Sequence, residues 1–232
     1  MNSLLLCLIG LATSLATDPV TELAEATRTY DVDRARAVLV TLENVDELDT
    51  LTLRVKAHLL VAELLRMEFS YLPEAETKTR RALGKEIDAA ADAGLAELDG
   101  LPESSEKHRL KADLLGTKIR SNYRAGKLKG PMNSAVEEAL RQDPQNAYAY
   151  VTKAKTLLFQ PSPSEEELRN ALTLLETAQS LGKDLEQGRL LAAYGHKLLG
   201  ETRQARERWK QCVRENPDCT PAARELNLIR PE

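Results

Sequence analysis

The chain has 232 residues, of which 42% are hydrophobic and 29% are charged, which is enough apolar material for a packed core in one elongated domain or two small ones. Its formal net charge of −4 argues against general nucleic-acid binding, which needs a clustered basic surface. Aromatic residues make up 4% of the chain, while alanine, leucine, glutamate and arginine dominate. Because these residues favour helices and strand formers are scarce, the composition predicts an all-α fold.

The first residues differ from the rest of the chain. The run Leu4–Ala16 carries no charge and is 13 residues long, too short to span a bilayer and typical of the core of a signal peptide. Ser14 and Ala16 are small residues at positions −3 and −1 of a possible cleavage site after Ala16, as signal peptidase requires. We therefore expect a signal peptide over 1–16, no stable membrane span, and a periplasmic or secreted location. No Lys or Arg precedes the run, so a retained first helix packed on the rest of the chain is the alternative.

The first half of the remaining chain alternates between helical periodicity and short breaks. The helix over about 50–69 is apolar on nearly all sides, which predicts that it lies in the middle of the fold. The next helix ends at Asp99-Gly100-Leu101-Pro102, a common helix stop. Helices are expected at about 19–29, from 31 to about 42, at 50–69, at 74–98, and after Ser105 through Leu110, Leu114, Ile119 and Tyr123.

The second half continues the pattern. The basic, glycine-containing stretch Gly126–Pro131 is interpreted as a turn. Helices are expected after it at about 132–142, 145–159, 164–181, 185–199, 201–215 and 219–229. No alternating run is long enough to predict a strand.

The sharpest motif lies near the C-terminal end. Ala205 is followed four residues later by Trp209 and then by Pro217, while Gly200 ends the preceding helix. A small residue, a large aromatic residue and a terminating proline at this spacing are typical of the second helix of a tetratricopeptide repeat. The chain therefore resembles the tetratricopeptide-repeat (TPR) superfamily, clearly across about 113–230 and weakly across 18–112.

A second observation supports the register. Pro144 and Pro217 are 73 residues apart, whereas two repeats span about 68. The excess of five residues falls in the two-proline loop Phe159–Pro163. This insertion and the exported start also give a weaker likeness to periplasmic TPR components of transport systems.

The resemblance implies an α-solenoid of stacked antiparallel hairpins. We divide the chain into a signal peptide over 1–16, a divergent hairpin region over 17–112, and TPR-like repeats with a C-terminal capping helix over 113–232. Stacked hairpins form a concave groove lined by the first helix of each repeat. In this register the groove-facing positions are Leu114, Thr117, Ser121, Arg124, Tyr148, Val151, Lys155, Leu158, Gln187, Leu190, Tyr194 and Lys197.

We expect a protein or peptide partner in this groove, contacted by aromatic anchors and by cations that pair with its carboxylates. The expected contact residues are Arg124, Tyr148, Lys155, Tyr194 and Lys197. Residues on the outer wall, such as Arg206 and Arg208, should matter far less. Homo-oligomerisation stays open at this point.

Two cysteines remain after removal of the signal peptide. Cys212 and Cys219 are seven residues apart and are candidates for a disulfide in an oxidising compartment, or for two packed thiols. The three histidines are far apart, and no CxxC or HxxxH spacing predicts a metal site.

Catalytic motifs are absent from the sequence. There is no phosphate-binding glycine loop, no G-x-S-x-G and no H-E-x-x-H, so we expect neither an enzyme nor a cofactor. The leading hypothesis is an exported interaction scaffold. An accessory subunit of an envelope transport or assembly complex is the alternative, and a helical-solenoid enzyme acting on cell-wall glycans is a remote one, which would need paired carboxylates in a cleft.

Overall fold

The structure is a computed structural model, and it describes residues 18–43, 45, 47–160, 162–182 and 185–228. The expected signal peptide lies outside these residues. The described part of the chain consists of helices and connecting turns, without a strand. Its helices are α1 (Pro19–Thr29), α2 (Val32–Leu42), α3 (Leu48–Tyr71), α4 (Thr77–Leu98), α5 (Ser105–Thr117), α6 (Asn122–Gln142), α7 (Ala147–Leu158), α8 (Glu165–Ser180), α9 (Glu186–Leu198), α10 (Thr202–Glu215) and α11 (Thr220–Leu228).

Local sequence explains where many of these helices begin. A side-chain oxygen just before the helix accepts a backbone N–H of the first turn, which satisfies a donor that has no partner within the helix. Ser164 goes further, because Glu167 bonds back to its backbone and completes a capping box. The side-chain caps are Asp18, Asp31, Ser104, Ser121, Asn146 and Ser164.

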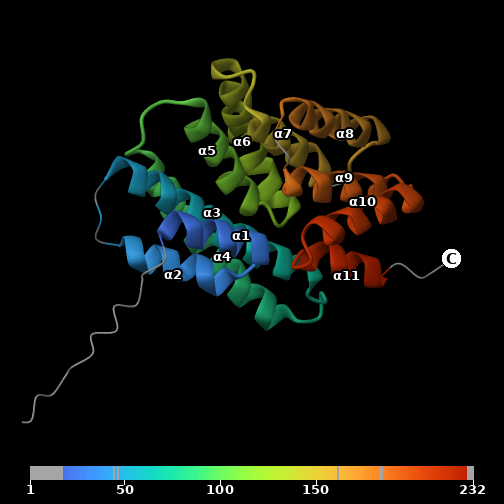
Figure 1. The fold of residues 1–232 in the computed structure, drawn as a ribbon, viewed down its shortest axis with the longest axis horizontal. Helices are drawn as coiled ribbons and strands as arrows, with labels where there is room; N and C mark the ends of the chain where they lie inside the picture. The colour runs from blue at the N-terminus through green and yellow to red at the C-terminus, as the bar shows by residue number, and fades with distance from the viewer. Residues whose placement is uncertain (1–17, 44, 46, 161, 183–184, 229–232) are drawn as a thin grey trace, which may run out of the picture.

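The described helices pack as five antiparallel hairpins followed by a single helix. The pairs are α1–α2, α3–α4, α5–α6, α7–α8 and α9–α10, with α11 packed on α10 (Figure 1). Helices α3, α5, α7 and α9 also contact one another in sequence, so they form an inner layer, while α4, α6, α8 and α10 lie outside. This arrangement confirms the expected all-α solenoid of stacked hairpins.

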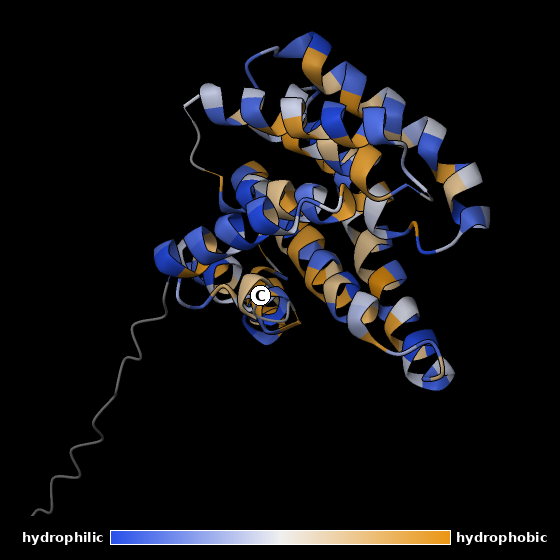
Figure 2. Ribbon diagram, turned by 90° about the vertical axis from the view of Figure 1, so that its right-hand side faces the viewer, coloured by the Kyte–Doolittle hydropathy of each residue, from blue (hydrophilic) through white to orange (hydrophobic). Residues whose placement is uncertain are grey.

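Apolar residues fill the spaces between neighbouring helices. Figure 2 shows hydrophobic and hydrophilic residues alternating along most helices, as expected where one stripe faces a partner helix and another faces water. Helix α3 is buried on several sides and contacts α1, α2, α4 and α5, which confirms its predicted central place. The described helices include none that is both long and apolar enough to cross a bilayer.

The predicted turn at Gly126–Pro131 is wrong, because α6 runs through it without interruption. Buried Ala125, Met132, Val136 and Ala139 keep helical spacing across the stretch, and Met132 and Val136 belong to one apolar cluster with residues of α5. A Cβ atom at Gly126 or Gly130 would meet nothing within 4 Å, so both glycines lie on an open side of the helix. The preceding helix is correspondingly shorter than expected and ends at Thr117.

The expected region boundary between residues 112 and 113 falls inside α5. Both halves of that helix carry buried residues, from Leu110 in the first half to Leu114 and Leu115 in the second. Helices pack as hairpins both before α5 and after it in the chain, as α3–α4 and α7–α8 show.

The two ends of the array meet. Figure 1 shows the red C-terminal helix α11 returning toward the blue N-terminal hairpin. Arg28, at the end of α1, bonds to Asp218 at 2.6 Å, and Tyr71, at the end of α3, donates a 3.4 Å hydrogen bond to Glu225 on α11. The ring of Tyr30 packs into the apolar cluster that contains Trp209. Side chains, more than backbone packing, therefore close the superhelix on itself.

Candidate functional site

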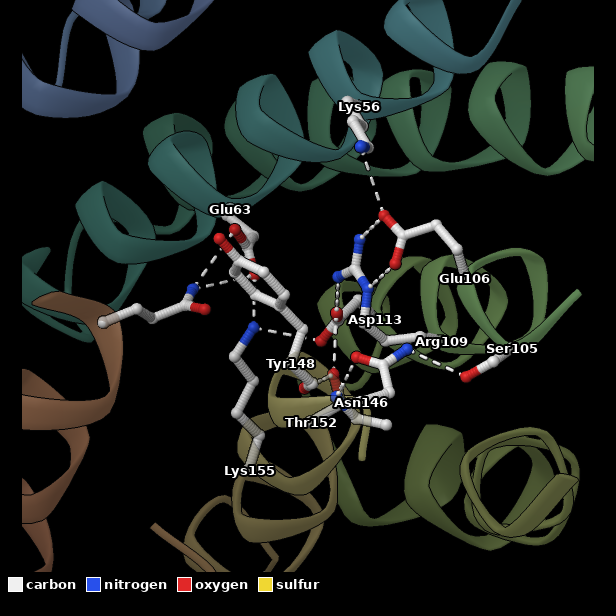
Figure 3. A network of polar contacts seen from close by, with 12 residues as sticks. Lys56, Glu63, Ser105, Glu106, Arg109, Asp113, Asn146, Tyr148, Thr152 and Lys155 are labelled. Carbon is white, nitrogen blue, oxygen red and sulfur yellow. Dashed lines mark hydrogen bonds and ion pairs between the residues drawn. The ribbon is translucent and has the colours of Figure 1, made fainter. Parts of the chain in front are cut away.

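The concave face is built by the inner helices, and its centre is a polar network (Figure 3). The Lys155 ammonium on α7 lies 2.6 Å from a carboxylate oxygen of Glu63 on α3 and 3.0 Å from one of Asp113 on α5. The Asp113 side chain is only 2% exposed, and it also accepts hydrogen bonds from Arg109 at 2.7 Å and from the Thr152 hydroxyl at 2.9 Å. The Lys155 ammonium therefore joins three helices, α3, α5 and α7.

The network extends toward the beginning of α5. Both oxygens of Glu106 accept hydrogen bonds from Arg109, at 2.7 and 2.8 Å, and Lys56 lies 3.3 Å from the same carboxylate. Burial alone would raise the pKa of Glu106, but hydrogen bonds and charge from Arg109, together with Lys56, outweigh it and lower the pKa to about 2.

Burial alone would lower the pKa of Lys155, the opposite of its effect on Glu106. It favours the neutral amine, but the nearby carboxylates of Asp113 and Glu63 outweigh it and raise the Lys155 pKa above its ordinary value of 10.5. Three cations, on Lys56, Arg109 and Lys155, thus face the three carboxylates of Glu63, Glu106 and Asp113. The charges balance within the protein, so Lys155 is already paired where the sequence suggested a ligand-binding cation.

Aromatic side chains flank this network. Tyr148, at the beginning of α7, is 46% exposed, and the Arg109 guanidinium lies 5.6 Å from the centre of its ring. Phe159, directly after α7, is 42% exposed and lies 5.5 Å from the ring of Tyr194 on α9. Arg66 on α3 approaches the same phenylalanine at 5.8 Å. Two accessible aromatic positions therefore lie at opposite ends of the same inner helix.

Arg66 is held in place by the end of α5. Its guanidinium donates to the carbonyl oxygens of Gly116 at 3.1 Å and Thr117 at 3.2 Å, and to that of Ile119. The last carbonyls of a helix lack the N–H partners of the next turn, and a cation at a helix C-terminus also interacts favourably with the helix dipole. The cation beside Phe159 is thus fixed by the fold.

The predicted contact residues fall into two groups. Tyr148, Lys155, Tyr194 and Lys197 all lie on the inner helices α7 and α9, as the register predicted. Lys197 is 43% exposed and pairs at 2.6 Å with Glu225 of α11. Arg124 lies on the outer helix α6, where its two terminal nitrogens bond to Asp88 of α4 at 2.7 and 2.8 Å. Its predicted place on an inner helix is wrong, because Ser121 caps a new helix there.

Several other groove-facing predictions are also wrong. Their side chains are buried between helices, so they are part of the core: Leu114, Thr117, Val151 and Leu158. Phe159, Arg66 and Glu63 also lie at the site, although the sequence did not predict them there. Phe159 lies at the start of the two-proline insertion, and that position was a signal for an accessible aromatic residue. The pairing of Glu63 with Lys155, across 92 residues, leaves no local signal.

The two cysteines lie together in the last apolar cluster. Cys212 and Cys219 are buried free thiols in this structure, and the Tyr30 hydroxyl lies 3.6 Å from the sulfur of Cys219. A hydrogen bond from Cys212 lowers the pKa of Cys219, while the same contact and burial raise that of Cys212. Their proximity is compatible with the disulfide expected in an oxidising compartment, which stays a prediction. In the described part of the chain, no group of histidine, cysteine and acidic residues forms a metal site.

Comparison with known proteins supports the fold. No protein-family model and no curated protein matches the sequence. Among solved structures, TTC0263, a thermophilic TPR protein from Thermus thermophilus, is 13% identical and aligns with a TM-score of 0.56 over 91% of this chain and 98% of its own. YrrB, described as a TPR protein with an unusual peptide-binding site, is 12% identical and aligns over 90% of this chain and 97% of its own, with a lower TM-score of 0.44. The chain therefore has a TPR-like fold.

Proposed function

We propose that this protein is an exported interaction scaffold that binds a protein or peptide partner on its concave face. One observation carries the proposal. The aromatic rings of Tyr148 and Phe159 stay 46% and 42% exposed at the two ends of α7, although apolar partners are plentiful in the core. Exposed aromatic side chains on a concave surface provide apolar contact area at low entropic cost.

The arrangement favours an extended segment that carries apolar side chains. Such a segment would place one side chain against Tyr148 and another against the pair of Phe159 and Tyr194. Lys197 is the cation best suited to a ligand carboxylate, because its side chain is 43% exposed. Lys155 contributes indirectly in this proposal, by holding α3, α5 and α7 together.

The proposal places the protein in the periplasm or outside the cell, after removal of residues 1–16. Mass spectrometry of the protein purified from its native host should find a mature chain that begins at Thr17 or within a few residues of it. An intact Met1 in the soluble cytoplasmic fraction would refute export and leave the concave-face proposal standing.

Site-specific photocrosslinking tests the binding face. A photoreactive phenylalanine analogue at position 148 or 159 should give a partner adduct in intact cells. The same analogue at Tyr123 is the matched control, because that side chain is 71% exposed on the outer helix α6. Adducts at position 123 alone would contradict binding at the concave face.

The alternative, an accessory subunit of an envelope transport or assembly complex, uses the same face and differs in having one obligate partner. Purification from envelope fractions separates the two functions. A constant, stoichiometric partner that survives high salt indicates the subunit, whereas partners that vary with growth conditions indicate a general scaffold.

A further inference from the structure

The outer wall of the last two hairpins carries a cleft that the concave-face proposal does not use. Helices α8 and α10 both pack on α9. Leu172, Leu175 and Ala192 line a depression between these three helices together with Glu176, and Arg208 and His196 lie beside them. The same arginine and histidine also line a second, more open depression along α10. The first depression is a slot with leucines and one carboxylate in its lining, and the second is a basic shelf along α10; the two are continuous on the convex side. We refer to the two depressions together as the α8–α10 cleft.

The basic character of the shelf comes from α10. Arg203, Arg208 and Arg214 line it, together with His196, Gln204, Gln211 and a single carboxylate, that of Glu207. The Lys210 ammonium, 2.9 Å away, already pairs with that carboxylate. No described residue makes an ion pair or hydrogen bond with the guanidinium group of Arg203, Arg208 or Arg214.

These arginines differ from most others in the chain. The guanidinium groups at the concave network and between α4 and α6 are bonded to carboxylates or to helix-terminal carbonyls, as Arg109, Arg66 and Arg124 show. On α10 three guanidinium groups that make no ion pair or hydrogen bond with a described residue gather within twelve residues of one helix, beside the slot, and the charges of two of them, Arg203 and Arg214, act on Glu207. A guanidinium group offers several N–H donors in a planar fork that matches a carboxylate.

We propose that the α8–α10 cleft is a second interaction surface, which binds an acidic segment of a partner protein. Carboxylates of the segment pair with Arg203, Arg208 and Arg214, and one apolar side chain between them enters the slot at Leu172 and Leu175. The proposal adds a convex-side surface to the concave one and does not depend on it.

Other anionic partners fit the cleft less well. Neither depression is lined by a tyrosine, phenylalanine or tryptophan that would stack on nucleic-acid bases, and the chain carries a net charge of −4. On α10, the described residues include no exposed large hydrophobic side chain that would enter a lipid bilayer. A protein segment that combines carboxylates with an apolar side chain matches both parts of the cleft.

The test is a titration of the full mature chain with a short synthetic peptide, capped at both ends, of sequence Glu-Glu-Leu-Glu-Glu. Its matched control has glutamine at every glutamate position. Binding is followed by fluorescence anisotropy and by the NMR shifts of the arginine side-chain N–H groups and the Trp209 indole. We expect the acidic peptide to bind, the glutamine peptide not to bind, and affinity to fall as salt rises from about 50 to about 300 mM.

Variants locate the site. Arg203→Glu with Arg208→Glu should weaken binding of the acidic peptide by at least about tenfold, because each reversal replaces attraction with repulsion. Arg81→Glu is the control, since Arg81 is an exposed arginine on the outer helix α4 with no described ion pair. Tyr148→Ala should leave this affinity unchanged, which separates the test from that of the concave face.

Three outcomes would overturn the proposal. The first is no shift of the α10 arginine signals at millimolar peptide. The second is an equal loss of affinity in the Arg81→Glu variant. The third is tighter binding of single-stranded RNA or of phosphatidylserine vesicles at the same arginines.

Discussion

The Tyr30 hydroxyl donates a 2.6 Å hydrogen bond to the carboxylate of Glu186, 156 residues later in the chain. The same carboxylate accepts the side-chain amide of Asn216 at 3.0 Å on each oxygen, and that amide also donates to the backbone carbonyl of Arg28 at 2.8 Å. One carboxylate at the start of α9 thus links the first hairpin to the turn before α11. We refer to these contacts as the closing contacts.

Removing the Tyr30 hydroxyl should loosen the closing contacts. We expect Tyr30→Phe to lower the free energy of unfolding by about 1.5 kcal/mol, the lower range for a hydrogen bond to a charged group. The control is Tyr150→Phe, whose hydroxyl bonds to the Pro144 carbonyl on the surface at 3.1 Å and should matter by less than about 0.5 kcal/mol. Urea unfolding followed by circular dichroism measures both. Equal effects would show that the contact between the ends does not contribute to stability.

Trp209 is 1% exposed and is the largest fully buried side chain of the described core. Trp209→Ala should cost about 3–5 kcal/mol, because the cavity it leaves between α9, α10 and α11 cannot collapse fully. Thermal unfolding followed by circular dichroism is the measurement, since the variant also loses the chain's tryptophan fluorescence. Val40→Ala, at a site 72% exposed on α2, should change little. An unchanged melting temperature in Trp209→Ala would refute its structural role.

Lys155 should behave as a structural residue. Lys155→Met leaves Glu63 and the buried Asp113 without their shared cation, and we expect a loss of about 3 kcal/mol. Lys197→Met should cost less than Lys155→Met, because Lys197 is 43% exposed and its partner Glu225 keeps the hydrogen bond from the Tyr71 hydroxyl. The two variants are compared by urea unfolding at neutral pH. Charge reversal at Lys155 is consequently a poor probe of partner binding, whereas reversal at Lys197 is suitable.

The depressed pKa of Glu106 predicts a contribution to acid stability. Its folded value of about 2 lies below the ordinary 4.5, so the folded state favours the carboxylate. That contribution is complete above pH 4.5 and is lost as pH falls from 4.5 toward 2. Glu106→Gln should therefore unfold more easily at pH 7 and show a flatter decline in this window. Parallel curves for the two proteins, measured by urea unfolding at several pH values, would contradict the assignment.

The cysteine pair gives a redox prediction. Protein purified from an oxidising compartment should contain a bond between Cys212 and Cys219, seen as protection of both thiols from alkylation in denaturant until a reductant is added. The Cys212→Ser variant should leave Cys219 open to alkylation under the same conditions. Two free thiols in the exported protein would show that the pair is packed and not bonded.

Some of this architecture could be predicted from local patterns. The spacing of Ala205, Trp209 and Pro217 identified a second helix and its buried positions, because one apolar face packed on a partner helix requires that periodicity. The all-round apolar character of α3 indicated its central place for the same reason. Both predictions rest on residues whose partners lie within one hairpin or the next.

The remainder depends on contacts that are distant in the sequence. Gly126 and Pro131 are residues that favour turns, so the sequence alone predicts a break there. The helix continues because its apolar face is buried in the packed hairpin, and that burial is not visible in the local sequence. The pairing of Lys155 was missed because its partners come 92 and 42 residues earlier. A positively charged residue at a groove position looks the same in sequence whether it faces a ligand or an internal carboxylate.

The closing contacts also limit how this protein can change in length. An open solenoid can gain or lose a hairpin at modest cost, since each repeat contacts only its neighbours. Here an added hairpin would carry Asn216 and Glu186 away from Tyr30, and the first and last helices could no longer meet. Insertion of a single further hairpin would therefore break the closing contacts. The repeat number is fixed by geometry.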